Sequence, residues 1–311
     1  MQVHRNTERL PHFRNAVVTI GTFDGVHTGH KKIIGQLKDE AKHTGGETVI
    51  ITFHPHPRKV VGNDNRPIQL INTLDEKIGL LAAEGVDHLV IVPFTKEFSN
   101  QSADQYIHDF LIGKFHPHTV IIGYDHRFGH DRKGDYRLLE DYASRHEFNL
   151  KEIPEHVINS LTVSSTRIRE AVRSGNIQAA RELLGYDFFF EGEVIQGNKL
   201  GRTLGYPTAN LKVNEAEKLV PGDGIYAVEA IVDPISGSPR LKGMMSIGLR
   251  PTIGDGKRMI EVNLFNFDRE IYGQNMRVYV KAFMRPEAKF NGLEELKEQL
   301  HKDKAAALQL L

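Results

Sequence analysis

Cysteine is missing from this chain of 311 residues. Its absence excludes disulfides, thiolate catalysis and zinc or iron–sulfur centres held by cysteine. An excess of charge is missing as well, because 40 Lys and Arg residues balance 40 Asp and Glu residues. Without a basic excess we expect no nucleic-acid partner and no anionic membrane surface, so any phosphate chemistry must be local.

Long apolar runs are also absent. No run approaches the length of about 18 residues that a membrane span needs, and the N-terminal segment MQVHRNTERLPHF is too polar for a signal peptide. We therefore expect a cytoplasmic protein without a membrane partner, whose oligomeric state the sequence leaves open. With 40% hydrophobic residues, the chain is long enough for two domains with ordinary cores.

The first part of the chain alternates between short apolar runs and amphipathic helical patterns. Buried strands are predicted at 17–21, 48–53, 88–94 and 119–125. A helix is predicted over 29–43, with Ile33, Ile34, Leu37 and Ala41 on one stripe. Capping-box spacing marks further helix starts at Thr73 with Glu76 and at Ser102 with Gln105. This order predicts an α/β domain with a Rossmann-like parallel sheet, which binds ligands at the carboxyl ends of its strands.

The second part has a different pattern. Runs typical of strands lie at 188–195, 225–232, 241–248, 259–267 and 276–284, separated by glycine, proline and asparagine turns. They predict an all-β antiparallel domain, followed by a helix over 293–311 whose Leu293, Leu296 and Leu300 lie against it. We place the boundary near 185, giving domains 1–185 and 186–311.

The stretch GTFDGVHTGH, residues 21–30, follows the first buried strand and enters a helix. Free backbone N–H groups and the helix dipole make such a place a phosphate site. Glycines there have no side chain, so phosphates can approach the backbone closely. His27 and His30 are three residues apart, so their rings can donate hydrogen bonds to oxygens that gain charge during phosphoryl transfer. Taken alone, the stretch is equally compatible with a glycine-rich turn carrying two solvated histidines. Its place between a strand and a helix favours the functional interpretation.

Five segments in order resemble one family, the bacterial bifunctional riboflavin kinase/FMN adenylyltransferases, also called FAD synthetases. They are GTFDGVHTGH (21–30), TFHPHP (52–57), GYDHRFG (123–129), VSSTRIR (163–169) and GNKLGRTLGYPTANL (197–211). His126 stands where the family pattern leads us to expect an aromatic residue. The resemblance spans the whole chain, and it implies that the all-β domain is a barrel.

For the first domain, the resemblance implies catalytic roles for His27 and His30. It also implies an ATP site made by residues from three of the segments: Gly21, Phe23, Asp24, Gly29, Asp125, Arg127, Ser164, Ser165, Thr166 and Arg169. Ser164, Ser165 and Thr166 precede a helical pattern, so they can cap a helix and offer hydroxyls to phosphate. Phe53, Pro55 and His56, with His54 beside them, are expected at the flavin end of this site. We do not interpret the histidine pairs His54/His56 and His116/His118 as a metal site, because no carboxylate stands at ligand spacing.

For the second domain, the resemblance implies a kinase site. Its ATP-binding residues are expected to be Gly197, Leu200, Gly201, Arg202, Gly205, Pro207, Thr208 and Asn210. Thr208 and Asn210 face one side of an extended segment, and two neutral oxygens together with substrate phosphates suffice for Mg²⁺. Glu261 shares a strand face with Asn263, opposite Val262 and Leu264. The resemblance makes Glu261 the base that accepts the ribityl hydroxyl proton, with Arg277 as a further flavin contact.

The implied function is two-step flavin cofactor synthesis, with ATP, riboflavin, FMN and FAD as its small molecules and Mg²⁺ as its metal. Riboflavin is phosphorylated in the second domain, and FMN is adenylylated in the first. Two alternatives remain open. One is a flavin-sensing regulator that retains the fold without turnover. The other is a different enzyme with a His-x-Gly-His element, such as a class I aminoacyl-tRNA synthetase, which the missing basic surface disfavours.

Overall fold

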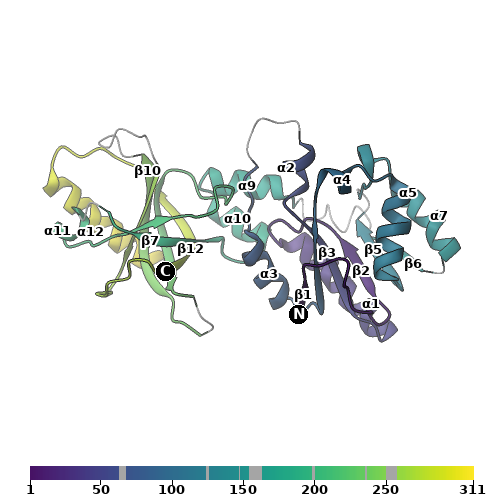
Figure 1. Ribbon diagram of the computed structural model, residues 1–311. Helices are drawn as coiled ribbons and strands as arrows, with labels where there is room; N and C mark the ends of the chain where they lie inside the picture. The colour runs from purple at the N-terminus through teal and green to yellow at the C-terminus, as the bar shows by residue number, and fades with distance from the viewer. Residues whose placement is uncertain are drawn as a thin grey trace. The chain divides into compact units, whose positions relative to one another are not determined.

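The computed structural model (Figure 1) describes residues 1–62, 68–123, 126–146, 148–153, 163–197, 200–234, 237–249 and 258–311. The chain divides into two compact units, Met1–Ser165 and Thr166–Leu311, and each is described here by itself. Two helices that precede the expected boundary at 185, α9 (Ser165–Arg173) and α10 (Ile177–Leu184), fall almost wholly in the second unit. The domain boundary near 185 stays a prediction.

The first unit contains a parallel sheet of six strands in the order β1-β4-β3-β2-β5-β6. The strands are β1 (Gln2–His4), β2 (Val17–Ile20), β3 (Thr48–His54), β4 (His88–Pro93), β5 (Thr119–Gly123) and β6 (Asn149–Ile153). The four strands predicted from apolar runs and the Rossmann-like fold class are confirmed. The edge strands β1 and β6 were not predicted because they are short and largely polar, and a polar edge gives no apolar run.

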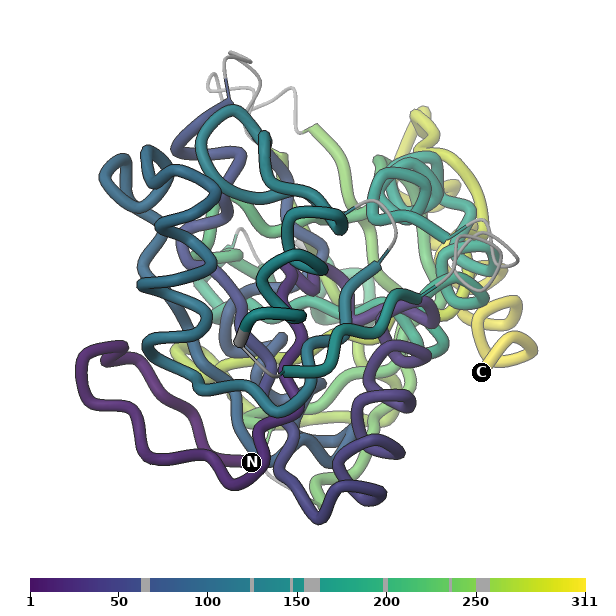
Figure 2. The backbone as a smooth tube through the Cα atoms, turned by 90° about the vertical axis from the view of Figure 1, so that its right-hand side faces the viewer, coloured from purple at the N-terminus to yellow at the C-terminus, as the bar shows by residue number. Residues whose placement is uncertain are grey.

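Helices cover both faces of this sheet. They are α1 (Thr28–Thr44), α2 (Pro57–Val61), α3 (Leu74–Ala83), α4 (Lys96–Ser99), α5 (Ala103–Gln105), the π-helix η1 (Tyr106–Ile112), α6 (Gly113–Phe115), the 3₁₀ turn η2 (His130–Arg132) and α7 (Tyr136–His146). One core packs Ile34 and Leu37 of α1 against the sheet, and a second packs Phe110 and Phe115 on the other face. Both predicted capping boxes are present. In Figure 2 the purple N-terminal segment runs from β1 through a loop before β2.

The strand order reverses between β2 and β5, which are neighbours although two strands intervene in sequence. In open α/β sheets, ligands bind at the carboxyl ends of the strands beside such a reversal. The His-x-Gly-His stretch follows β2, and the segment 52–57 overlaps the end of β3, so both lie at this edge.

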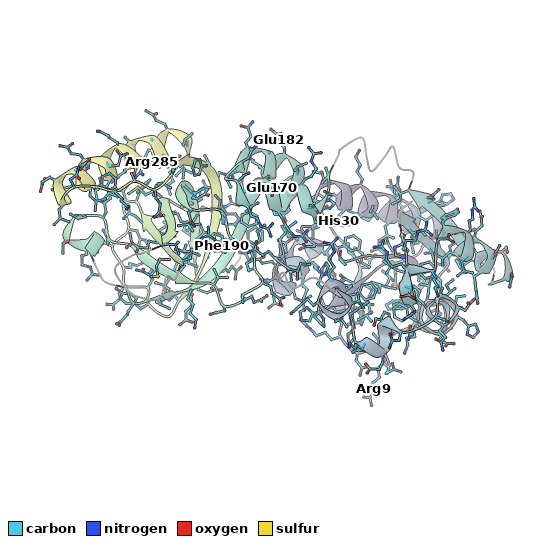
Figure 3. The ribbon with its side chains drawn as sticks, turned by 90° about the horizontal axis from the view of Figure 1, so that it is seen from above. Arg9, His30, Glu170, Glu182, Phe190 and Arg285 are labelled. Atoms are coloured by element: carbon cyan, nitrogen blue, oxygen red, sulfur yellow. The ribbon has the colours of Figure 1, made fainter. Side chains whose placement is uncertain are left out.

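The second unit is a closed barrel in the order β10-β11-β8-β7-β12-β9, with antiparallel pairing throughout. Its strands are β7 (Phe189–Ile195), β8 (Ala209–Lys212), β9 (Gly224–Val232), β10 (Leu241–Leu249), β11 (Arg258–Leu264) and β12 (Asn275–Arg285). Alternate side chains of each strand share one face, and Phe190 of β7 (labelled in Figure 3), Val228 of β9 and Val278 of β12 are fully buried. The predicted barrel is confirmed.

The C-terminal helix α12 (Leu293–Leu310) lies along the barrel (Figure 1). Its Leu300 and Ala307 pack on Met244 and Ala227, so the helix covers part of the outer barrel wall. The expectation that Leu293 packs there as well is wrong: Leu293 is 56% exposed, since it starts the helix one turn before the packed residues. A short helix, α11 (Leu200–Thr203), precedes β8. None of the described helices is both long enough and apolar enough to cross a membrane.

Candidate active sites

The first candidate site is the loop between β2 and α1. Phe23, Gly25 and Val26 have φ angles of 47°, 95° and 36°, a region that L side chains rarely adopt. A strained loop persists only where its surroundings fix it. Here the carboxylate of Asp24 accepts the backbone N–H groups of Ile71 and Asn72 at 2.9 and 3.3 Å.

His27 and His30 meet at the start of α1. His27 caps the helix, and its Nδ1 accepts the backbone N–H of His30 at 3.3 Å. The two rings stack with centroids 3.6 Å apart, which confirms that they point to one side. A side chain at Gly29 would lie only 3.2 Å from the His27 ring, so glycine leaves that ring its place. Because Nδ1 of His27 accepts a bond, the proton of its neutral ring lies on Nε2, where it can be donated.

Burial keeps both imidazoles neutral at pH 7. It lowers the pKa of His27 to about 4, although nearby Asp24 opposes the shift. Burial also keeps the pKa of His30 well below its usual range, and the charges of His27 and Lys77 add to this effect. Nδ1 of His30 is buried and has no hydrogen-bond partner within the described part of the chain. The site therefore offers imidazole groups that are uncharged at neutral pH.

Other predicted ATP contacts are only partly brought together. Ser165 donates from Oγ to the backbone oxygen of Asp24 at 2.9 Å, which links the Ser-Ser-Thr segment to the loop. Arg127 instead pairs with Asp135 at 2.9 Å on an exposed surface. Thr166 and the buried Arg169 belong to the second unit, so their part in this site stays a prediction. Asp125 lies outside the described residues.

The predicted flavin contacts lie at the end of β3. Phe53 packs with Phe94 and Phe98 at centroid distances of 5.4 and 5.7 Å. Pro55 follows, and Nδ1 of His56 caps α2 by accepting the backbone N–H of Arg58 at 3.2 Å. The sequence analysis did not include Phe94, which follows the neighbouring strand β4, or Phe98, which lies on α4.

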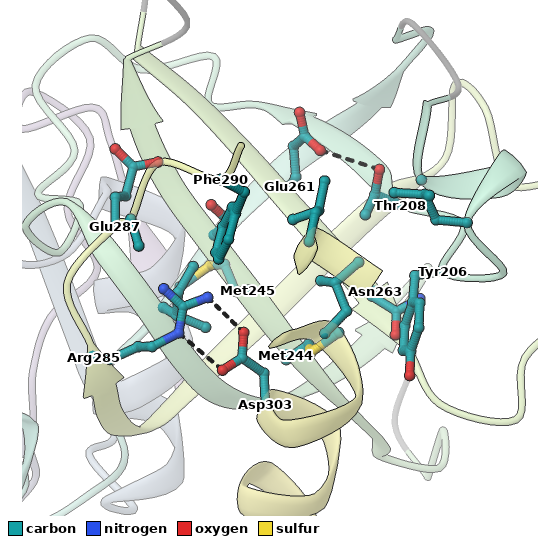
Figure 4. Close-up of a pocket in the computed structure, with 17 residues that line it drawn as sticks. Tyr206, Thr208, Met244, Met245, Glu261, Asn263, Arg285, Glu287, Phe290 and Asp303 are labelled. Carbon is teal, nitrogen blue, oxygen red and sulfur yellow. Dashed lines mark hydrogen bonds and ion pairs between the residues drawn. The ribbon is translucent and has the colours of Figure 1, made fainter. Parts of the chain in front are cut away.

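The second candidate site is a cavity of about 270 Å³ between the outer barrel wall and α12 (Figure 4). Thr208, Glu261 and Asn263 line it on one side. Val262 and Leu264 line a different cavity, so the predicted division of this strand into two faces is confirmed. The remaining walls are mainly apolar, and Met244, Met245, Phe290, Leu296 and Leu300 contribute to them.

Glu261 lies among several polar groups on this side of the barrel, of which Thr208 and Asn263 line the cavity and Asn210 does not. Thr208 donates from Oγ1 to Oε2 of Glu261 at 3.2 Å (Figure 4). Asn210 on β8 lies directly opposite Glu261 on the antiparallel neighbour β11, so the two side chains share a face of the sheet. Oδ1 of Asn210 is buried and has no hydrogen-bond partner among the described residues. Asn263 donates to the backbone oxygen of Pro207 at 2.7 Å and so fixes the segment before β8.

The glycine-rich segment packs closely on this group. A side chain at Gly197 would collide with the amide of Asn210, and one at Gly201 with the backbone of Tyr206. Gly205 has a φ angle of 82° and ends the turn after α11. Arg202 is exposed and lines two neighbouring cavities with Pro207. Leu200 begins α11, and its side chain is not among those described.

Arg277 is not brought to the cavity. It lies on β12, where it donates from Nε to Glu191 at 2.7 Å and covers the ring of Phe189 at 4.9 Å. The sequence analysis also missed a pair inside the cavity, in which Arg285 makes two hydrogen bonds to Asp303 of α12 at 2.9 and 2.6 Å (Figure 4). These two residues lie 18 positions apart and carry no common motif.

Comparisons with known proteins agree for both units. A family model described as FAD synthetase matches residues 10–167, and one described as riboflavin kinase matches residues 184–311. Three bifunctional riboflavin kinase/FMN adenylyltransferases are similar. The protein from Listeria monocytogenes is 39% identical, with 93% of this chain and 90% of that protein covered. The Bacillus subtilis protein is 37% identical, with 94% and 92% covered. The Escherichia coli K12 protein is 34% identical, with 94% and 91% covered.

A solved structure is also similar. The crystal structure described as a macrolide-efflux protein from Streptococcus pneumoniae matches with a TM-score of 0.86 and 29% identity, covering 98% of each chain. The identity, coverage and order of the two matched regions establish that this chain belongs to the bifunctional riboflavin kinase/FMN adenylyltransferase family.

Proposed function

We propose that the two activities of the family are carried in this chain by two separate sites. FMN is joined to the adenylyl group of ATP at the carboxyl edge of the parallel sheet, and riboflavin is phosphorylated in the cavity between the barrel and α12. The observation that carries the proposal is the gathering of distinct groups in each unit: stacked neutral imidazoles in one and a carboxylate with neutral oxygens in the other.

In the adenylyl-transfer site, a phosphate oxygen of FMN attacks the α-phosphorus of ATP, and the bond to pyrophosphate breaks. The attacking phosphate is already an anion, so no base is required. Charge grows on the oxygens around phosphorus, and donors aimed at them lower the barrier. His27 suits this role because its Nε2 proton is free to be donated while Nδ1 is held by the backbone of His30. The backbone N–H groups at the start of α1 add a site for the phosphates.

In the kinase site, the 5′-hydroxyl of the ribityl chain attacks the γ-phosphorus of ATP, and ADP leaves. This attacking group is neutral and must lose a proton, so an acceptor within hydrogen-bond reach assists the step. Glu261 supplies that acceptor, and Thr208 orients its carboxylate through the 3.2 Å bond. The apolar walls of the cavity fit a flat flavin ring, since cofactor sites are lined mainly by apolar groups with a few polar ones.

The residues around Thr208 and Asn210 fit a magnesium ion. The buried Oδ1 of Asn210, which lacks a hydrogen-bond partner among the described residues, and the Thr208 hydroxyl are hard oxygen donors. The glycine at 197 keeps the space beside Asn210 free of a side chain. When bound, Mg²⁺ would neutralise charge on the ATP phosphates. Thr208 and Asn210 would hold it, and Glu261 would remain the proton acceptor.

A product assay tests the proposal. The pure protein is incubated with riboflavin, ATP and magnesium, and the flavins are separated by chromatography. We expect riboflavin to convert first to FMN and then to FAD. A protein that binds flavins but makes neither product would be a flavin-sensing relative without turnover, and the proposed function would be abandoned.

A further inference from the structure

Lys77 is a buried charge that no part of the mechanism above uses. It lies on α3, and only 7% of its surface is exposed. Burying an ammonium group is costly unless it is paired and hydrogen-bonded. Nζ of Lys77 donates to the backbone oxygen of Thr22 at 2.7 Å, inside the strained loop that precedes His27. A buried charge in this place lowers the stability of the fold, so we expect the charge to serve the site that it contacts.

The same carbonyl accepts a second bond, from the hydroxyl of buried Thr52 on β3 at 3.2 Å. The loop is thus held at Thr22 by one charged donor and one neutral donor. If only a hydrogen bond were required there, Thr52 would already provide it. Lys77 differs from Thr52 by its charge, and a structural role at this carbonyl does not require a charge.

The charge of Lys77 acts within the catalytic group. Burial lowers the pKa of Lys77 to about 8, and Asp24 opposes this shift, so the side chain is mostly charged at pH 7. Its field helps to keep the pKa of His30 below the usual range. Lys77 therefore acts on His30 and on the loop before the histidines at the same time.

We propose that Lys77 is a positioning residue of the adenylyl-transfer site, which holds the loop through Thr22 and places a fixed positive charge near His30. This inference rests on the site proposed above. The charge adds to the effect of burial, which disfavours protonation of His30, and it attracts the phosphate oxygens that gain negative charge during transfer. The bond from Lys77 to Thr22 keeps the backbone of residues 21–26 in the conformation that phosphate binding requires.

The test compares Lys77→Met, which removes the charge, with Thr52→Val, which removes the neutral donor to the same carbonyl. We expect Lys77→Met to lower kcat for FMN-to-FAD conversion about 10- to 100-fold, with KM changing less, because the charge acts mainly in the transition state. Thr52→Val should lower kcat less than about 5-fold, since a neutral bond contributes little. Riboflavin phosphorylation, carried by the other unit, should be unchanged in both variants, and circular dichroism with thermal unfolding checks that the unit containing Lys77 and Thr52 is folded.

Imidazole titration followed by NMR provides a readout that a merely structural role would not move. Loss of the positive charge should raise the pKa of His30 in Lys77→Met and leave it unmoved in Thr52→Val. Equal losses of kcat in both variants with an unmoved His30 titration, or a near-normal kcat in Lys77→Met, would overturn the proposal. If Lys77→Met does not fold, Lys77→Gln, which is also uncharged, gives the same readouts. A wild-type protein that makes no FAD would refute the proposed function, and the titration would still test the charge of Lys77.

Discussion

The two proposed sites use different side chains for two related transfers at phosphorus. In the parallel-sheet unit, burial keeps two imidazoles neutral, and they can act as hydrogen-bond donors. In the barrel unit, a carboxylate on a strand stands beside a threonine hydroxyl and an asparagine amide. The difference follows from the attacking group: an FMN phosphate is an anion and needs no base, whereas a ribityl hydroxyl must give up its proton. The nucleophile explains the choice of residues better than the shared substrate ATP does.

The strongest test of this comparison separates the two units. Fragments 183–311 and 166–311 should each fold and make FMN, while FAD formation should be lost completely because His27 and His30 are absent. The longer fragment keeps α9 and α10, and α10 contacts β12, so we expect it to be the more stable of the two. Flavin chromatography and thermal unfolding measure both effects. A folded fragment that binds riboflavin without phosphorylating it would contradict the two-unit interpretation.

The next largest effect is expected at the base of the kinase site. Glu261→Gln keeps the size and hydrogen bonding of the side chain and removes its basicity, so FMN formation should fall by about 10²–10⁴ with riboflavin binding little changed. Conversion of supplied FMN to FAD should stay normal in the same protein and serves as the control. Near-normal kinase turnover would remove Glu261 from the mechanism.

The matching change in the other unit is His27→Ala. Loss of one donor to the transition-state oxygens should lower FMN-to-FAD conversion by about 10²–10³, or about 3–4 kcal/mol. Riboflavin phosphorylation should continue. An equal fall in both activities, with the fold intact by circular dichroism, would show that the two sites are not independent.

The metal requirement sharpens the comparison on the kinase side. Chelation with EDTA should stop FMN formation. Asn210→Ala should raise the magnesium concentration needed for half-maximal rate at least about 10-fold, which is a size seen even when an outer-shell partner is lost. Thr208→Ala should act in the same direction. Full kinase activity in excess EDTA would be incompatible with the proposed metal site.

The last expected effect concerns the pH dependence of stability. The folded chain holds the pKa of His27 near 4, against 6.5 for an ordinary histidine. The unfolded chain takes up a proton below pH 6.5 and the folded chain does not, so stability present above pH 6.5 is lost as the pH falls toward 4. His27 should contribute about 2–3 kcal/mol to this loss. Urea unfolding at pH 7.5 and pH 4.5 measures it, with His27→Gln as the control. Equal losses in both proteins would contradict the buried, neutral histidine.

Much of the fold could be predicted from periodicity alone. The four central strands of the sheet are buried on both faces and appear as continuous apolar runs, and α1 shows one apolar stripe, so local pattern and final burial agree. The edge strands β1 and β6 are short and polar and have no such pattern. Leu293 shows the opposite failure, because helical spacing alone does not reveal where the packed part of a helix begins.

The sequence by itself determined the family, the fold class and the groups of residues proposed to carry phosphate chemistry, because glycine, histidine and hydroxyl residues stand in short segments whose local geometry follows from their spacing. Only the tertiary structure decided which distant residues meet them. Lys77 donates a hydrogen bond to Thr22, 55 positions away in the sequence, and Arg285 of β12 donates one to Asp303 of α12. Lys77 does stand on the apolar stripe of α3 with Leu74, Ile78 and Leu81, a conflict that can mark a buried charge. Its partner is fixed by the packing of α3 against the loop, which no local pattern encodes.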